Sequence, residues 1–290
     1  MCYIQNMKTE TKIPILVIVG PTASGKTGLA IKLAKERNGE VISADSRQVY
    51  KGLDIGTGKV TMAEMDGVKH HLLDVADPKK VFSVSDFQKL GKEAIADIHN
   101  RGKLPIVAGG TGFYIQALVD GLILPEVTPD KVLRKRLEKM PLPKLLSLLK
   151  KLDKKRYETI DKSNPVRIIR AIEIAKSLGQ VPALKSKTNY EPKIIGISIE
   201  PERLKKNIHD RLIARLEMGM IDEVRNLHKN GLSWKRMEAL GLEYRYIARF
   251  LQGKLTETEM LEQLETAINQ YAKRQMTWFR RDKRVEWINI

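Results

Sequence analysis

The sequence predicts an α/β fold: a doubly wound parallel sheet with a helical insertion and a helical C-terminal region. Up to about Gly121, short apolar runs alternate with segments of helical periodicity, as a parallel sheet requires. Residues 125–192 show helical periodicity without a convincing strand, and an apolar strand then returns at 193–199. Beyond Pro201 the chain is helical almost to a short strand expected at 285–288.

The first expected element is a strand that leads into a phosphate-binding loop. Residues 15–19 form an unbroken apolar run, typical of a strand buried on both faces. The next residues read GPTASGKT, which fits the pattern G-x-x-x-x-G-K-[ST], and helical spacing follows up to Arg37. This order predicts a P-loop NTPase-like fold and is a poor match to a simple Gly/Ser-rich turn. We expect a diphosphate or triphosphate to bind Gly20, Pro21, Thr22, Ala23, Ser24, Gly25, Lys26 and Thr27.

The residue types of this loop explain the expected chemistry. Glycines allow successive backbone N–H groups to point at one anion, and the helix N-terminus faces the same anion. Lys26 adds a mobile positive charge, and the hydroxyl of Thr27 can join the coordination shell of Mg²⁺. The loop recognises phosphate and does not distinguish the group attached to it.

Further strands are expected to deliver polar residues to the same edge of the sheet, where open α/β sheets bind ligands. The expected strands are 40–44, 70–75 and 104–108, and the expected helices of this part are 87–100 and a segment ending at Val119. In the insertion, helices are expected at 131–140, 143–152 and 165–178. These elements suggest a P-loop core at 1–121, a helical insertion at 122–192, and a return strand with a helical region at 193–290.

The composition indicates the kind of partner. Lysine and arginine exceed aspartate and glutamate to give a net charge of +17, which favours a polyanion such as nucleic acid over a neutral ligand. A generically basic surface is the alternative. No apolar run reaches membrane-spanning length. The N-terminus lacks an export signal and the chain has one cysteine, so we expect a cytoplasmic protein without an internal disulfide or a cysteine-based zinc site.

Several polar residues near the expected strand ends are candidates for chemistry. Asp45 could bind Mg²⁺ or act as a base, and a turn-capping role is about as probable for it. Asp74 could be a metal ligand, although an ordinary strand-end turn is the better interpretation. His70 and His71 are adjacent, so their side chains point to opposite faces of a strand and are expected to be structural or to line the site. The glycines before Thr111 allow a close approach of backbone or ligand.

Basic side chains recur at helical spacing in three places. Arg167 and Arg170 share one helix face, as do Arg211 and Arg215; a solvated face is the better expectation for such pairs. The C-terminal cluster at 271–284 differs because its basic residues surround three aromatic rings. Cations for phosphate and rings for base stacking are what single-stranded or looped RNA requires. Some of these rings are also expected in the helix core.

These segments together resemble the signature blocks of the bacterial tRNA dimethylallyltransferase (tRNA isopentenyltransferase) family. The blocks cover the chain from about Ile15 to Trp287 in the order of the family. The phosphate loop alone is widespread, whereas the blocks at 45–50 and 271–280 are far more specific. The matching segments are 20–27, 45–50, 52–57, 70–74, 109–114 and 271–280.

The resemblance implies transfer of a dimethylallyl group from its diphosphate to N6 of the adenosine 3′ of the anticodon in tRNA. By the family pattern Asp45 is the general base, Thr27 lies at Mg²⁺, and Thr111 and Arg211 lie near the reacting centre. The donor is dimethylallyl diphosphate, and we expect a monomer. The residues implied to contact tRNA are Asp45, Ser46, Arg47, Gln48, Thr111, Arg134, Val166, Arg167, Ile168, Ile169, Arg170, Lys273, Arg274, Gln275, Thr277, Trp278 and Arg280.

Three other functions are compatible with parts of the sequence: a P-loop kinase of small molecules, a prenyltransferase acting on AMP, and an RNA-binding regulator. The basic, aromatic C-terminus argues against the first two, and Asp45 beside a complete phosphate loop argues against a pure binder. One segment departs from the family pattern. The run at 240–245 is two residues longer than the usual Gly-Tyr-Arg block, so we carry over no tRNA contacts at 239–246. Which tRNAs are modified, and whether ATP binds the loop, stays open.

Overall fold

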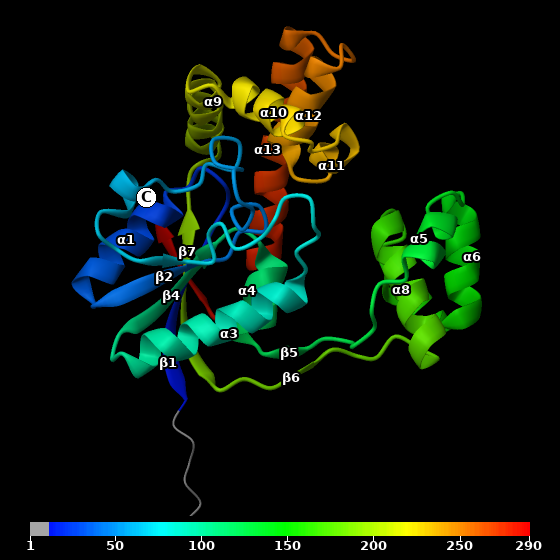
Figure 1. The fold of residues 1–290 in the computed structure, drawn as a ribbon. Helices are drawn as coiled ribbons and strands as arrows, with labels where there is room; N and C mark the ends of the chain where they lie inside the picture. The colour runs from blue at the N-terminus through cyan, green and yellow to red at the C-terminus, as the bar shows by residue number, and fades with distance from the viewer. Residues whose placement is uncertain (1–11) are drawn as a thin grey trace, which may run out of the picture. The chain divides into compact units, whose positions relative to one another are not determined.

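A six-stranded sheet in which all neighbouring strands are parallel forms the centre of the fold (Figure 1). The computed structural model describes residues 12–290. Cys2 and the segment on which the expectation about export rests therefore lie outside the described residues. The strand order is β3-β2-β4-β1-β7-β8. The strands are β1 (Ile13–Val19), β2 (Gly39–Ser43), β3 (His70–His71), β4 (Leu104–Gly109), β7 (Tyr190–Ser198) and β8 (Val285–Asn289).

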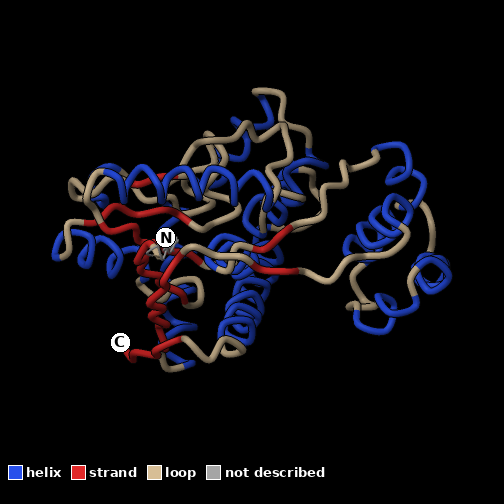
Figure 2. The backbone as a smooth tube through the Cα atoms, turned by 90° about the horizontal axis from the view of Figure 1, so that it is seen from below, coloured by secondary structure: helices blue, strands red, loops and turns tan. Residues whose placement is uncertain are grey.

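Helices cover both faces of this sheet, which is why its central strands are apolar without alternation. On one face α1 (Lys26–Glu36) packs Ala30 and Ala34 against Leu16, Ile18 and Val41 of the strands. The other face is covered by α3 (Val84–Asn100) and α4 (Gly112–Val119), whose apolar side chains meet the odd-numbered residues of β1. Figure 2 shows the strands lying between these helices. The expected doubly wound fold is thereby confirmed.

The C-terminal helices form a second layer of core above the carboxyl ends of the strands (Figure 1). Apolar residues of the segment 49–53, which follows β2, pack among them. The long helix α13 begins with a capping box between Thr256 and Glu259, which satisfies the first backbone N–H groups. The helices are α9 (Pro201–Glu217), α10 (Met220–Lys229), α11 (Trp234–Glu238), α12 (Leu242–Leu251) and α13 (Glu257–Phe279), and a short α2 (Met62–Met65) precedes β3.

Residues Leu122–Lys187 form a separate compact unit, and the other described residues, 12–121 and 188–290, form a second. The small unit has its own apolar core, to which α6 and α8 contribute most, including the buried Leu149, Ile168 and Ile172. It contains α5 (Lys131–Leu137), α6 (Leu142–Leu152), α7 (Lys154–Thr159) and α8 (Pro165–Leu178), and the short antiparallel pair β5 (Leu122–Ile123) and β6 (Lys185–Ser186).

The structure corrects several details of the expected elements, and the short α2 and β5 are among the elements that were not expected. The strand expected at 70–75 ends at His71, because Leu72 and Asp74 have φ angles of 65° and 54°, which interrupt extended backbone. The short helix α7 and strand β6 have no counterpart among the expected elements, since such brief segments carry little periodicity. Among the helices of residues 12–290, none is long and apolar enough to cross a membrane.

Candidate active site

Three strand ends converge on one pocket. Because β4 lies between β1 and β2, the segments that follow these strands are neighbours at the carboxyl edge of the sheet. They are the phosphate loop after β1, Asp45 after β2 and Gly110 after β4. The pocket is lined by Thr22, Lys26, Thr27, Val41, Ser43, Asp45, Gln48, Thr57, Val60, His70, Ala108, Gly109, Gly110, Arg211, Tyr271 and Gln275.

The phosphate loop has the backbone geometry that its glycines allow. Gly25 has a φ of 79° and caps the N-terminus of α1, so the helix begins at Lys26 with its first N–H groups at the loop. Gly20 has a φ of 156°, and a Cβ atom there would lie 3.2 Å from the Cβ and carbonyl oxygen of Ile197. The loop is therefore pressed against β7, which fixes its position next to the pocket.

Lys26 is a cation in a confined place. Its Nζ donates to the carbonyl oxygen of Pro21 and lies 3.4 Å from Oγ of Ser24. Burial, reinforced by the positive charge of Arg211 and opposed by Asp45, lowers the pKa of Lys26 to about 7. An anion bound in the loop would place an opposite charge beside the ammonium of Lys26 and so keep it protonated.

Asp45 makes the expected turn and also lines the pocket. Its Oδ1 accepts hydrogen bonds from the backbone N–H groups of Arg47 at 2.7 Å and Gln48 at 3.3 Å, which makes the turn after β2. The carboxylate also lines the pocket. Within residues 12–290 no hydrogen bond engages Oδ2, so one oxygen builds the turn and the other is available to a ligand.

Thr111 joins the ends of β4 and β2. Its Oγ1 accepts from the N–H of Ser46 at 3.0 Å, and its own N–H donates to the carbonyl of Ala44 at 3.2 Å. The preceding Gly109 lies so close that a Cβ atom there would collide with the Ala44 carbonyl. Gly109 thus serves a close approach of backbone to backbone, which holds Asp45 beside the end of β4, whereas Gly110 makes room for the side chain of Gln275.

Gln275 connects the far end of the chain to this site. Its Oε1 accepts from the N–H of Thr22 at 2.8 Å, and its Nε2 donates to the carbonyl of Gly110 at 2.9 Å. The side chain is buried, so both of its polar atoms are used inside the protein. Tyr271, one turn earlier on α13, lines the pocket, and burial raises the pKa of its hydroxyl to about 12.

The expectation of a solvated face for Arg211 and Arg215 is wrong. Arg211 lines the pocket, where burial and the charge of Arg215 lower its pKa to about 10. The Arg215 side chain is 11% exposed and lies 3.5 Å from the carboxylate of Glu243. Both guanidinium groups occupy the space beside Gly58, where a Cβ atom would collide with them. These two cations, of which Arg215 pairs with Glu243 of α12, make this side of the pocket attractive to anions.

The weaker metal candidates are engaged elsewhere. Asp74 forms an ion pair with Lys59, with Nζ and Oδ1 2.5 Å apart, as expected of a strand-end turn. His71 contacts the buried carboxylate of Glu40 at 2.8 Å, whereas Nδ1 of His70 lies 2.9 Å from the carbonyl of Val68 and its ring lines the pocket. No cluster of three or more His, Cys, Asp or Glu side chains within residues 12–290 could hold a metal ion.

The basic cluster on α13 divides into buried and exposed residues. Phe279 is buried and Trp278 packs against the main core, where its ring meets Phe113 edge-on. Among the residues of this cluster implied to contact tRNA, the exposed ones are Lys273, Arg274, Thr277 and Arg280. Arg274 lies 5.9 Å from the centre of the Tyr271 ring, so cation and ring are already paired on this face.

The small unit holds the remaining residues implied to contact tRNA. Arg134 and Arg170 both pair with the buried carboxylate of Glu173, at 2.6 and 3.4 Å, and stabilise this unit from within. Ile168 and Ile169 are buried in its core, so only Val166 and Arg167 of this helix face present exposed side chains.

Three polar residues around the pocket escaped sequence reasoning. Glu243 pairs with Arg215, Tyr244 is buried, and the carboxylate of Glu223 accepts the Tyr244 hydroxyl at 2.7 Å. The segment 239–246, on which we carried over no contacts, therefore has an internal role. Its Arg245 donates to the carbonyl of Glu238 at 3.0 Å. The Gly-rich run at 52–58 was a partial signal, because glycines there allow other groups to approach closely.

Comparison with known proteins agrees with this geometry. The model of the IPP transferase family matches residues 48–282. A tRNA dimethylallyltransferase of Geotalea uraniireducens is 43% identical over 278 residues, covering 94% of this chain and 92% of that protein. A tRNA dimethylallyltransferase of Anoxybacillus flavithermus is 40% identical over 282 residues, covering 95% and 90%.

Solved structures give the same result. A full-length tRNA isopentenylpyrophosphate transferase from Bacillus halodurans is 40% identical with a TM-score of 0.73, over 96% of this chain and 90% of that one. A eukaryotic dimethylallyltransferase acting on tRNA is 27% identical with a TM-score of 0.79, over 96% and 74%. With a family model that matches most of its length, and relatives this similar from end to end, the chain belongs to the IPP transferase family.

Proposed function

We propose that this protein transfers a dimethylallyl group from dimethylallyl diphosphate to N6 of the adenosine 3′ of the anticodon in tRNA. The observation that carries the proposal is the pocket in which Asp45 and the phosphate loop face the same space. Its wall includes Tyr271 of α13, the helix that also carries exposed cations. An anion site, a carboxylate and a basic helix together are what transfer from a diphosphate to RNA requires. The names of the relatives support the same reaction.

The phosphate loop would hold the diphosphate of the donor. Negative charge grows on this group as the bond from oxygen to the allylic carbon breaks, so preorganised donors that face it lower the barrier. The backbone N–H groups at the start of α1, the ammonium of Lys26 and the guanidinium of Arg211 are such donors. These groups recognise phosphate and not the group attached to it, so the loop can hold a prenyl diphosphate in place of a nucleotide. The proposed reaction therefore needs no nucleotide hydrolysis.

The residues of the phosphate loop are compatible with a Mg²⁺ ion beside the bound diphosphate. Thr27 lies in the first turn of α1, lines the pocket and is exposed, so its hydroxyl can act as a ligand. Mg²⁺ keeps several waters and takes phosphate oxygens, so one protein hydroxyl is sufficient for such a site. When bound, the ion would neutralise part of the charge on the leaving diphosphate.

Asp45 would act at the acceptor. The exocyclic amine of adenine is a poor nucleophile because its lone pair is delocalised into the ring, so it needs a base within hydrogen-bond reach. A bond forms between N6 and the allylic carbon while the carbon–oxygen bond to diphosphate breaks, and the N6 proton moves to Oδ2 of Asp45. Oδ1 stays bound to the two backbone N–H groups, which keeps the carboxylate in place.

The tRNA would reach the pocket with its adenine swung out of the loop stack, at a cost of about a few kcal/mol. Contacts with phosphates and bases would offset that cost. In the larger unit we propose Ser46, Arg47, Gln48, Thr111, Lys273, Arg274, Thr277 and Arg280 for these contacts. In the helical insertion we propose Val166 and Arg167, the exposed members of their helix face. We propose that the protein works in the cytoplasm and acts as a monomer.

The test is direct. Purified protein is incubated with unmodified tRNA, dimethylallyl diphosphate and Mg²⁺, and the tRNA is digested and analysed by nucleoside mass spectrometry. We expect an adenosine that has gained one isoprenyl group, formed without ATP. A requirement for ATP with release of ADP would replace this proposal by a kinase, and modification of free AMP in preference to tRNA would replace the acceptor.

A further inference from the structure

We propose that Glu223 is a positioning residue: it holds the loop 53–58 in the place where that loop shapes one wall of the reaction pocket. The inference deepens the function proposed above and rests on it. Glu223 lies in α10, outside the residues that line the pocket, and does not itself touch a reacting atom in this arrangement.

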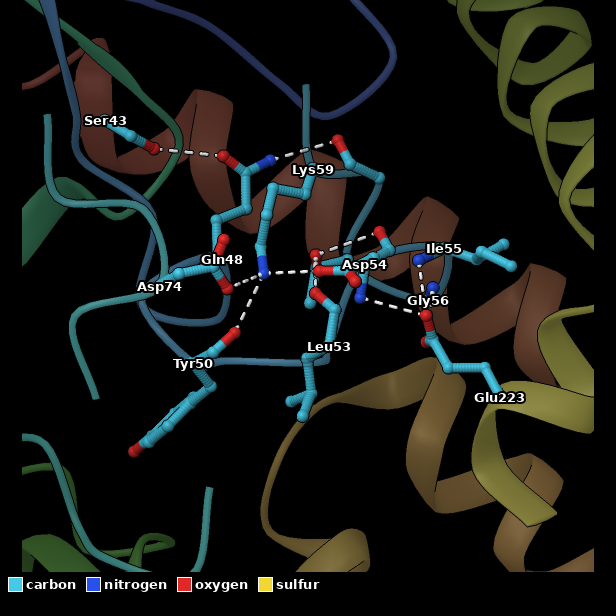
Figure 3. A network of polar contacts seen from close by, with 12 residues as sticks. Ser43, Gln48, Tyr50, Leu53, Asp54, Ile55, Gly56, Lys59, Asp74 and Glu223 are labelled. Carbon is cyan, nitrogen blue, oxygen red and sulfur yellow. Dashed lines mark hydrogen bonds and ion pairs between the residues drawn. The ribbon is translucent and has the colours of Figure 1, made fainter. Parts of the chain in front are cut away.

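The carboxylate of Glu223 is surrounded by donors from a distant part of the chain (Figure 3). Its Oε2 accepts from the N–H groups of Asp54 at 2.9 Å and Ile55 at 2.7 Å, and its Oε1 accepts from the N–H of Gly56 at 3.0 Å. The Tyr244 hydroxyl donates to the same Oε1 at 2.7 Å. Three successive backbone N–H groups that converge on one anion form a nest, and here the anion is a side chain of the protein.

There is no room for a side chain larger than that of glycine at position 56, in the middle of this loop. A Cβ atom on Gly56 would lie 2.7 Å from the ring of Tyr244, so the backbone comes close to α12 because residue 56 is a glycine. Lys59 fixes the end of the loop separately: its Nζ donates to Tyr50 O at 2.9 Å and to the carboxylates of Asp54 at 2.6 Å and Asp74 at 2.5 Å (Figure 3). The loop is therefore held by two sets of contacts, one from Lys59 and one from Glu223, and the contacts of Glu223 are on the side that faces the helices.

The loop acts on the pocket through its last residues. Thr57 lines the pocket, and its hydroxyl donates to the carbonyl of Leu53 at 2.6 Å. The carbonyl of Gly58 accepts from Nε2 of Gln48 at 3.1 Å, while Oε1 of Gln48 faces the hydroxyl of Ser43 at 3.0 Å. These two contacts fix which way the Gln48 amide points in the pocket. Gly58 is also the surface against which the guanidinium of Arg211 lies.

A chain of contacts therefore connects Glu223 to Gln48, Thr57 and Arg211. Replacement of Glu223 by glutamine keeps the shape and removes one acceptor. If the new NH₂ group of the glutamine faces Asp54 and Ile55, it meets two backbone N–H groups, and donor then faces donor. If the NH₂ group faces Gly56, the N–H of Gly56 loses its acceptor, although the Tyr244 hydroxyl can rotate and accept from the amide. Either way the loop loses part of its anchor, and small displacements of groups that orient a substrate are costly, up to about 10²-fold in rate for about 1 Å.

The experiment compares Glu223→Gln with Asp222→Asn in the transfer assay on tRNA. Asp222 is the adjacent carboxylate of α10, is exposed, and pairs with Arg225 on the surface. We expect Asp222→Asn to behave as wild type, and Glu223→Gln to lose roughly tenfold or more of kcat/KM for transfer. Binding of inorganic diphosphate, measured by calorimetry, should weaken much less than transfer, because within residues 12–290 the phosphate loop forms no hydrogen bond with Glu223 and, of the groups proposed to hold diphosphate, Arg211 alone lies against the loop 53–58.

A double-mutant cycle with Gln48 separates positioning from general stability. If Glu223 acts through the loop on Gln48, Gln48→Ala combined with Glu223→Gln should lose little more activity than the more severe single variant. Losses that multiply would overturn the inference, as would full activity in Glu223→Gln. If Glu223→Gln unfolds, Tyr244→Phe serves instead, because it removes one hydrogen bond to the same carboxylate. We expect Tyr244→Phe to lose less transfer activity, and its loss should not multiply with that of Gln48→Ala. Losses that multiply, or no loss of activity, would contradict the inference. Absence of transfer by the wild type would instead count against the proposed function.

Discussion

Replacement of Asp45 by asparagine is the sharpest test of the proposed chemistry. In the wild type, Oδ1 of Asp45 accepts from the N–H groups of Arg47 and Gln48 at 2.7 and 3.3 Å. Asparagine keeps an Oδ1 atom that can accept the same two hydrogen bonds, so the turn after β2 is retained. What is lost is the basicity of the second oxygen. A general base contributes about 10²–10⁴-fold to a rate, which corresponds to about 3–5 kcal/mol of activation free energy. We expect a loss of transfer in that range under single-turnover conditions.

The structure offers a matched control in Asp77. This exposed aspartate builds the same kind of turn, accepting from the N–H of Lys79 at 2.8 Å, away from the pocket. Asp77→Asn should transfer at the wild-type rate. Diphosphate should bind Asp45→Asn at least as tightly as wild type, because a negative charge near Lys26 has been removed.

The assay is a rapid-quench measurement of isoprenylated tRNA with both substrates bound, together with thermal unfolding of each variant. If Asp45→Asn and Asp77→Asn transferred at the same rate while both remained folded, Asp45 would be a turn residue and the general-base mechanism would be refuted. A loss of activity accompanied by a matching loss of thermal stability would point to the turn as the cause.

Three further predictions concern binding and stability. Neutralising Lys273 and Arg280 together should weaken tRNA binding and flatten its salt dependence by roughly 0.7–0.9 log units of slope per lost phosphate contact, measured by titration at several salt concentrations, with diphosphate binding unchanged. Gly109→Ala should destabilise the fold by about 1–3 kcal/mol in urea unfolding, because its Cβ would meet the backbone of Ala44, just after β2, whereas Gly28→Ala, with nothing within 4 Å, should not destabilise it. Glu40→Gln should flatten the stability profile between pH 4.5 and acid pH. Hydrogen bonds from Arg101, and then from Lys103 and His71, hold the pKa of Glu40 well below its ordinary value of 4.5, so the contribution of Glu40 to stability is present above that pH and is lost as the pH falls.

Local sequence patterns identified the elements that carry their own signal. The apolar run at 15–19 and the glycines and Lys26 of the next segment predicted strand, loop and helix because each is specified by adjacent residues. The end of the strand at His71 was not predictable in the same way. Leu72 and Asp74 have positive φ angles, which leucine rarely adopts and aspartate adopts only occasionally, so the residue types alone do not predict this interruption.

Side-chain roles in the site depended on contacts between distant residues. Gln275 matched a block associated with RNA, yet its amide bonds to Thr22 and Gly110, which are 253 and 165 residues away. Helical spacing showed that Arg211 and Arg215 share a face, but only the packing of Gly58 against them shows that this face is inside. Periodicity reports which residues share a side of a helix and does not report what covers that side.

The placement of Glu223 suggests why the C-terminal helices and the α/β core form one unit. The core alone could supply the phosphate loop and Asp45, but the loop 53–58 has no strand or helix of its own to keep it in place. Its backbone N–H groups are satisfied by a carboxylate of α10, and its carbonyl in turn orients Gln48 in the pocket. The same helical layer supplies Arg211 and, through Gln275, a tie between the phosphate loop and β4. Gln275 thus connects α13, whose exposed cations are proposed to bind tRNA, to the phosphate loop, so this helix also helps to hold the residues proposed for catalysis in place.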